Sequence, residues 1–261
     1  MMKQRNRKWR RRTVGLLVLA LALLLCACSG DLPAFEKDGD GYVNPETRVS
    51  YLAAPWNYEV FERMENRPVV RIAQDKIDDV ILYEVKDTDP SHYLSTENYD
   101  LFYASNLTLP TLAELNPSSV MVCQGADRSF VIETITDAAD VAAILAAAQA
   151  RPLDPDSFDA SEEHANFTLK FVSEQYPAFY YRFYYRQYDA PIESWVPIEN
   201  ADSFEVLYEN ADVRVEEDSD GLYAVYTLGV GVIYDYETGI FYTVGDLIAE
   251  YLQLDESGSD D

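Results

Sequence analysis

Acidic residues recur at alternate positions in the first polar stretch of the chain. Glu36, Asp38 and Asp40 are each separated by one residue, and Asn44 follows them. A calcium ion takes several hard oxygen ligands at about 2.4 Å, and carboxylates at alternate positions of a loop can supply them together. This spacing predicts that Glu36, Asp38, Asp40 and Asn44 form a calcium site.

The segment 36–44 resembles the start of the calcium-binding loop of EF-hand and dockerin proteins. Gly41 takes the sixth position of that loop and Val43 the eighth, as the resemblance requires. Glu36 stands where Asp is usual, Thr47 stands where a bidentate carboxylate is needed, and no amphipathic helix follows. We therefore expect weak binding at best, with a Kd on the order of 10⁻⁴ to 10⁻³ M. An ordinary Asp-Gly turn is the alternative.

A second group of chemically active residues is aromatic and basic. Residues 179–186 read Phe-Tyr-Tyr-Arg-Phe-Tyr-Tyr-Arg, and successive side chains of a strand point to opposite faces. We expect one face, with Phe179, Tyr181, Phe183 and Tyr185, to join the core. The other face would carry Tyr180, Arg182, Tyr184 and Arg186 as a ladder of stacked rings and guanidinium groups, or as a platform for a sugar or peptide. Cross-strand packing alone is the alternative for these residues.

Motifs for catalysis are mostly missing from the sequence. His92 and His164 are its two histidines, so a three-His zinc site is excluded, and no Gly-x-Ser-x-Gly, His-Glu-x-x-His or phosphate-binding Gly-Lys motif occurs. Cys123 lies in an apolar stretch, which favours a buried side chain over a reactive thiol. The 46 acidic residues guarantee many chance carboxylate pairs, so such pairs carry no information about hydrolysis. We name no catalytic residue.

The start of the chain has the order of a secretory signal. Seven basic residues precede an uncharged run from Val14 to Ala27, which at 14 residues is shorter than the roughly 20 that a membrane-spanning helix needs. The run ends in Leu25-Cys26-Ala27-Cys28, which resembles the lipobox of bacterial lipoproteins. The resemblance implies cleavage before Cys28, a diacylglyceryl thioether on its sulfur and an acylated amine, which together anchor a protein stably. An ordinary signal peptide cut near Ala27 is the alternative.

Charge limits the partners of the mature chain. Cleavage would remove seven of the 20 Lys and Arg residues, leaving 13 against 46 Asp and Glu and a formal net charge of −33. A chain this acidic repels phosphate backbones, so nucleic acid is excluded as a partner. It also repels anionic lipid headgroups, so we expect membrane contact through the lipid alone.

The elements that must position these residues follow from hydrophobic patterns. Helices are expected over 137–151, where Asp137 caps the first turn, and over 245–254. The stretch 87–117 is expected to be loop. Strands are expected at 48–52, 69–73, 80–85, 120–123, 130–134, 167–172, 178–188, 204–208, 213–216, 222–234 and 240–243.

This pattern predicts an α+β fold, mainly antiparallel sheet with about two packed helices. After a linker over residues 28–41, residues 42–254 would form one domain, or two subdomains divided near 152–166. A disordered acidic tail, 255–261, would follow.

Together these features predict a lipoprotein held at the extracytoplasmic face of the cell membrane. We expect a binding or interaction module for an envelope glycan, peptide or protein, with no cofactor apart from weakly bound calcium. The alternative is an envelope hydrolase that uses carboxylates. A cleft with converging carboxylates would favour the hydrolase, and a shallow aromatic surface would favour binding.

The anchor can be tested directly. Because lipid transfer needs the thiol of Cys28, Cys28→Ala should abolish acylation and membrane retention, whereas the matched Cys26→Ala should leave both intact. Labelling of producing cells with a radioactive fatty acid measures the first effect, and fractionation measures the second. Unchanged label in the Cys28 variant would contradict the lipoprotein assignment.

Overall fold

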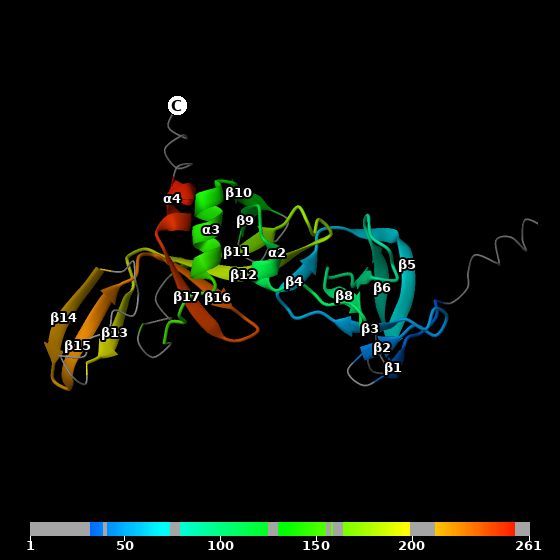
Figure 1. Cartoon of the computed structure of the whole chain (residues 1–261), viewed down its shortest axis with the longest axis horizontal. Coiled ribbons are helices and arrows are strands. Elements are labelled where there is room, and N and C mark those ends of the chain that lie inside the picture. The colour runs from blue at the N-terminus through cyan, green and yellow to red at the C-terminus, as the bar shows by residue number, and fades with distance from the viewer. Residues whose placement is uncertain are drawn as a thin grey trace, which may run out of the picture.

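The computed structural model describes residues 32–38, 41–73, 79–124, 130–154, 158, 164–198 and 212–253. The signal, Cys28, Asp40, the predicted strand 204–208 and the acidic tail lie outside these residues. Within them the chain has the predicted α+β fold: every pair of named strands is antiparallel, and the helices are few and short. Three sheets follow one another along the long axis of the molecule (Figure 1).

The first sheet is built from the N-terminal part of the chain and has seven strands. Their spatial order is β1 (Glu36–Asp38), β2 (Gly41–Val43), β3 (Ser50–Ala53), β8 (Leu101–Ala104), β7 (Tyr93–Ser95), β6 (Asp79–Val85) and β5 (Arg63–Ala73). Its own core contains Tyr51, Val70, Leu82 and Leu94.

The central sheet positions the aromatic run. Its order is β10 (Val131–Ile135), β9 (Ser119–Gln124), β11 (His164–Val172), β12 (Phe179–Tyr188), β16 (Gly231–Asp235) and β17 (Ile240–Gly245), with β4 (Tyr58–Val60) paired to the start of β12. The third sheet has the order β13 (Glu193–Pro197), β15 (Gly221–Thr227) and β14 (Asp212–Asp218).

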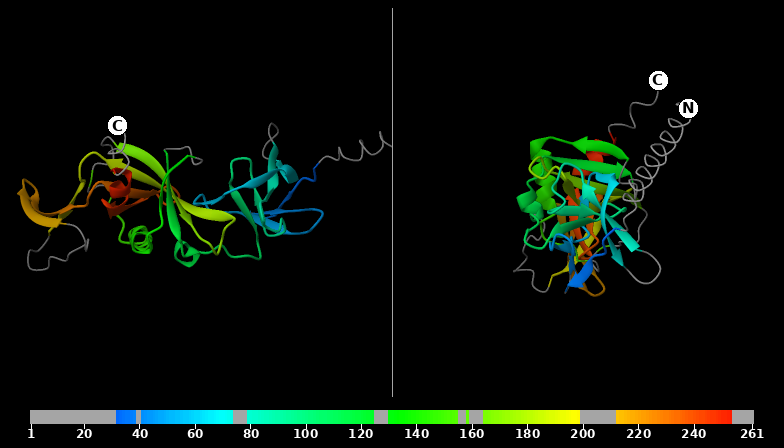
Figure 2. Two further views of the ribbon diagram at one scale, coloured as in Figure 1. Left: turned by 90° about the horizontal axis from the view of Figure 1, so that it is seen from above. Right: turned by 90° about the vertical axis from the view of Figure 1, so that its right-hand side faces the viewer.

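Helices pack on one face of the central sheet (Figure 2). They are α2 (Leu112–Leu115), α3 (Ala138–Ala147) and α4 (Leu247–Gln253). The Asp137 carboxylate caps α3 by accepting hydrogen bonds from the amides of Ala139 at 2.9 Å and Asp140 at 3.1 Å, as the sequence predicts. The hydroxyl of Tyr251 in α4 donates to the Asp140 carboxylate and so ties α4 to α3.

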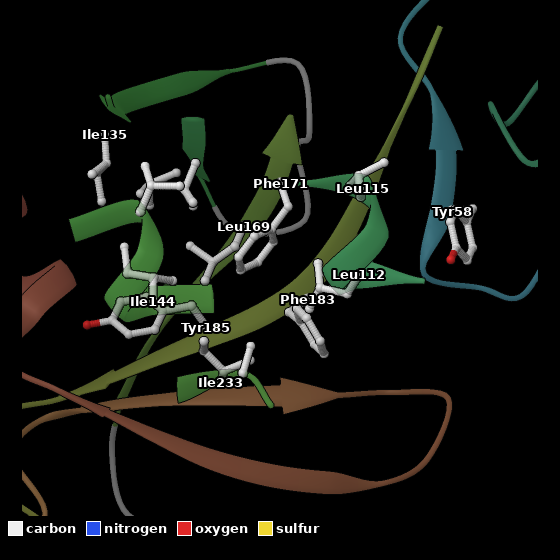
Figure 3. Packing of buried hydrophobic residues seen from close by; sticks show 14 of the residues in the cluster. Tyr58, Leu112, Leu115, Ile135, Ile144, Leu169, Phe171, Phe183, Tyr185 and Ile233 are labelled. Atoms are coloured by element: carbon white, nitrogen blue, oxygen red, sulfur yellow. The ribbon is translucent and has the colours of Figure 1, made fainter. Parts of the chain in front are cut away.

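The main core lies between these helices and the sheet (Figure 3). Phe183 and Tyr185 of β12 point toward the helices, beside Leu169 and Phe171 of the neighbouring strand β11. The rings of Phe171 and Phe183 meet edge to face, with centroids 5.7 Å apart. Cys123 is also fully buried, which confirms that it is a buried side chain.

Three predictions about elements are wrong. The predicted linker over 28–41 contains β1, and Phe35 beside it is buried in the core of the first sheet. The stretch 87–117, predicted as loop, contains β7, β8 and α2, because strands of three or four residues are stabilised by sheet neighbours that a local pattern does not reveal. The single strand predicted over 222–234 is two strands, β15 and β16, in different sheets. Gly229 interrupts it with a φ of +76°, a conformation that glycine adopts without strain.

The inward face of β12 generates a stability prediction. Phe183 is 2% exposed, so Phe183→Ala should lower the free energy of unfolding by about 3–5 kcal/mol through lost burial and a cavity. Phe130, at 56% exposure, is a matched control in the same part of the fold. Phe130→Ala should change the free energy of unfolding by less than about 0.5 kcal/mol. Urea denaturation of the full chain measures both. Equal losses would mean that Phe183 is not a core residue.

Buried tyrosines make the fold sensitive to alkali. Burial, with a smaller contribution from the Glu114 carboxylate, raises the pKa of Tyr58 to about 12, and its hydroxyl donates to the carbonyl of Pro110. An unfolded tyrosine ionises near pH 10. The stability that comes from the neutral, buried hydroxyl is therefore fully present below that pH. It is lost as the pH rises toward the folded-state pKa, because the unfolded chain ionises first.

We therefore expect the free energy of unfolding to be steady near neutral pH and to fall between about pH 10 and pH 12. Tyr58→Phe should make this fall shallower, because one of the tyrosines that ionises on unfolding is gone. Denaturant titrations at several pH values measure the slope. An identical slope in the variant would show that Tyr58 does not contribute to it.

Candidate functional site

A buried ion pair lies on the face of the central sheet opposite the helices. Arg182 of β12 is 2% exposed and Glu59 of β4 is fully buried, and the Arg182 guanidinium donates from Nη1 to Glu59 Oε1. The hydroxyl of Tyr180 donates to Glu59 Oε2 at 2.6 Å, and Arg182 Nε donates to the carbonyl of Trp56 at 2.9 Å. These bonds compensate two charges that would be costly to bury alone.

The ion pair sits where two strands share one edge of β12. β4 pairs with residues 179–181 and β16 with residues 184–187, which leaves Arg182 beside the gap between them. Asn57 fills the gap: its carbonyl accepts from the Arg182 amide at 2.7 Å, and its Nδ2 donates to the Arg182 carbonyl and to Asp235 Oδ1, each at 3.1 Å. The side-chain amide of Asn57 thus replaces a backbone hydrogen bond that a neighbouring strand would make to Arg182.

The turn between β16 and β17 closes over the same gap. Asp235 Oδ1 also accepts from the Glu237 amide at 3.0 Å, and Gly239, with a φ of +71°, returns a hydrogen bond to the Asp235 carbonyl at 2.8 Å. Glu237 Oε2 then accepts from the amide of Trp56 at 3.1 Å. Three segments that are far apart in the sequence are therefore held in fixed positions.

Four rings lie along this junction, and we name them the aromatic ridge: Trp56, Tyr184, Tyr234 and Tyr236. The centroid of the Trp56 ring is 5.1 Å from that of Tyr184 and 5.0 Å from that of Tyr236. Tyr236 also meets Tyr184 and Tyr234 edge to face, at 6.2 and 6.3 Å. The Arg182 guanidinium lies 3.6 Å from the centroid of Trp56, so the buried ion pair supports the ridge from beneath.

The rings of the aromatic ridge differ in exposure, and Tyr236 is the most exposed of them. Trp56, Tyr184 and Tyr234 are half-buried, whereas Tyr236 is 58% exposed and is the most exposed aromatic side chain among the described residues. Arg186 is half-buried beside them, with its guanidinium 5.2 Å from the centroids of both Tyr234 and Phe241. The ridge is thus an apolar surface with charged groups at its border.

The structure separates the four residues predicted as a binding surface. Tyr184 and Arg186 reach the ridge, but Tyr180 and Arg182 are 3% and 2% exposed and do not belong to a surface. Tyr180 is covered because β4 pairs beside it, the Phe61 ring lies 4.7 Å away and the Lys170 ammonium lies 4.7 Å over its ring. A second layer of side chains, which strand alternation cannot reveal, buries this half of the face.

Trp56, Tyr234 and Tyr236 were missed by reasoning from the sequence. A local signal existed for Tyr236, which lies between the predicted strands 222–234 and 240–243. A large aromatic residue in such a connection is exposed unless another part of the chain covers it. Nothing local marks Trp56, because its position depends on Glu237 and Arg182, which are more than a hundred residues away.

The predicted calcium residues lie in a β-hairpin rather than in a helix-flanked loop. Glu36 and Asp38 belong to β1, which pairs with β2, and Asp40 is outside the described residues. The side-chain oxygen of Asn44 accepts from the amides of Glu46 at 2.9 Å and Thr47 at 3.2 Å, as in an ordinary turn. Among the residues that the structure describes, no group of three or more His, Cys, Asp or Glu side chains could hold a metal ion. Calcium binding here stays a prediction.

The histidines and buried carboxylates lie in separate places. His92 follows a turn in which Asp89 accepts from the Ser91 amide at 2.8 Å, a bond that lowers the pKa of Asp89. His164 begins β11 and packs on Tyr188, with centroids 5.2 Å apart. At the junction, Glu59 is bonded to Arg182 and Tyr180, and Asp235 to Asn57. These carboxylates serve the structure of the junction.

No family model matches this chain, and no curated protein or solved structure is detectably similar to it. In the part of the chain that the structure describes, there is no helix long and apolar enough to cross a membrane. The aromatic ridge has to be interpreted from its own geometry.

The ion pair beneath the ridge generates a further prediction about stability. Glu59→Gln should lower the free energy of unfolding by about 3–5 kcal/mol, because it leaves the buried Arg182 charge without a counter-charge. Combining it with Arg182→Met should cost less than the sum of the two single changes, since the double variant buries no unpaired charge. Denaturation of the two single variants and the double variant measures the coupling. Strict additivity would mean that the two charges do not stabilise each other.

Proposed function

We propose that this chain is a lipoprotein, anchored through Cys28 at the extracytoplasmic face of the membrane, that binds an envelope component through the aromatic ridge. The lipobox-like sequence Leu25-Cys26-Ala27-Cys28 supports the anchor. The ridge supports binding, because its rings form a contiguous apolar surface that remains in part exposed to water.

The exposure of Tyr236 is the observation that carries this proposal. An aromatic ring that is 58% exposed contributes little to the stability of the fold. The centroid of the Tyr236 ring nevertheless lies 5.0 to 6.3 Å from the centroids of three other rings. The turn that bears it is held by Asp235 and Glu237. Rings held in advance of binding lose little conformational entropy when a ligand packs on them.

Co-sedimentation with delipidated envelopes of the producing bacterium tests the proposal. Removal of lipid from the envelopes separates ridge binding from insertion of the anchor, so the full-length protein can be used in detergent. Tyr184→Ala combined with Tyr236→Ala should reduce the bound fraction at least tenfold, since it removes two of the four rings. Phe130→Ala, which removes an equally exposed ring elsewhere, should leave binding unchanged. An equal effect of both variants, or none of either, would contradict the proposal.

A further inference from the structure

We infer that the ligand of the aromatic ridge is an uncharged polysaccharide, whose pyranose rings pack with their apolar C–H faces on Tyr236 and Tyr184. This inference rests on the proposed function and specifies its ligand. Four features of the site lead to it: the charge around the ridge, the use already made of the Trp56 ring, the pairing of the strands beneath, and the polar groups that border the rings.

The charge of the chain disfavours an anionic ligand. The sequence carries 46 acidic residues, and the exposed Glu237 borders the ridge, where one of its carboxylate oxygens accepts from the Trp56 amide. An anionic polymer would be repelled by the negative charge of the whole chain and also by this nearest carboxylate. Arg186 is the cation beside the ridge, and its guanidinium already faces Tyr234 and Phe241.

A cationic ligand is disfavoured by the way in which Trp56 is used. A cation is attracted to the face of an aromatic ring, and Trp offers the strongest such attraction. One face of Trp56 is already covered by the Arg182 guanidinium, 3.6 Å from its centroid, and Tyr184 and Tyr236 pack against the same ring. The ring with the strongest attraction for a cation therefore already holds a cation of the chain itself, and the most exposed ring of the ridge is that of Tyr236.

Strand pairing favours a sugar over an extended peptide. A peptide commonly binds to a sheet by adding a strand to a free edge. At the ridge, β12 lies between β11 and β16, and β16 lies between β12 and β17, so both strands have neighbours on each side. On these two strands recognition must come from side chains, which suits a ligand without a backbone of amides.

Polar groups suited to sugar hydroxyls border the rings. Among the described residues, the hydroxyls of Tyr184, Tyr234 and Tyr236 make no hydrogen bond, so each can donate to and accept from a ligand. The exposed Glu237 carboxylate can accept from sugar hydroxyls through the oxygen that Trp56 does not use. An apolar surface bordered by hydroxyl and carboxylate groups matches the two kinds of surface that a pyranose presents.

Calorimetry of the full-length protein in detergent tests the inference with matched probes. Chitin oligosaccharides and their deacetylated, cationic counterparts share one backbone and differ in charge, and soluble β-glucan, mannan and polygalacturonate extend the set to other uncharged sugars and to an anionic one. We expect binding of at least one uncharged probe, with a Kd that changes less than twofold between low and high salt, because no charges are paired.

Variants locate the binding. Tyr236→Ala should weaken binding of the uncharged probe at least tenfold. Tyr236→Phe should retain the stacking and lose only the contribution of the hydroxyl, and Phe130→Ala should have no effect.

Three outcomes would contradict these expectations. Preferential, Tyr236-dependent binding of the cationic oligomer or of polygalacturonate would overturn the inference that the ligand is uncharged and leave the ridge as a binding surface. No binding of any uncharged probe would overturn the inference even if the ridge variants fail to bind envelopes. Ridge variants that affect neither the probes nor the envelopes would overturn the proposed function as well.

Discussion

The carboxylate of Glu59 and the guanidinium of Arg182 must stay paired, because each is buried among side chains that could not stabilise it alone. Their contact joins β4, which leads into the first sheet, to β12, the strand with most neighbours in the central sheet. Tyr180 satisfies the second oxygen of Glu59, and the Trp56 carbonyl satisfies Nε of Arg182. This polar contact thus adds to the strand pairing that holds the segment before β4 against the central sheet.

The aromatic ridge depends on that contact. Trp56 is held from below by the guanidinium of Arg182 and at its amide by Glu237, while Asn57 bonds both Arg182 and Asp235. Without the ion pair, Trp56 would lose the support of the guanidinium that packs on its ring. The polar network and the exposed rings therefore form one unit, in which buried charges provide rigidity and the rings provide the surface.

The two faces of the central sheet are stabilised in different ways. On the helix side, aliphatic and aromatic side chains of β11 and β12 pack against α2, α3 and α4, and the gain comes from burial of apolar surface. On the opposite side, the gain comes from individual pairs, in which a charged group bonds an opposite charge or packs on an aromatic ring. Such pairing depends on direction and distance, so this face has less freedom to rearrange and suits the presentation of a fixed binding surface.

Periodicity alone determined much of the fold. The alternation in residues 179–188 predicts β12 and places Phe183 inside, the pattern after Asp137 predicts α3 and its cap, and consecutive hairpins predict antiparallel pairing. These features are local, since they depend on the spacing of neighbouring residues. The tertiary structure alone decided that Tyr180 and Arg182 are covered while Tyr184 and Arg186 remain accessible in part, and that Trp56 joins Tyr236. Contacts between residues separated by more than a hundred positions leave no periodic trace, because each partner is selected by where the sheet brings it and not by its own neighbours in the chain.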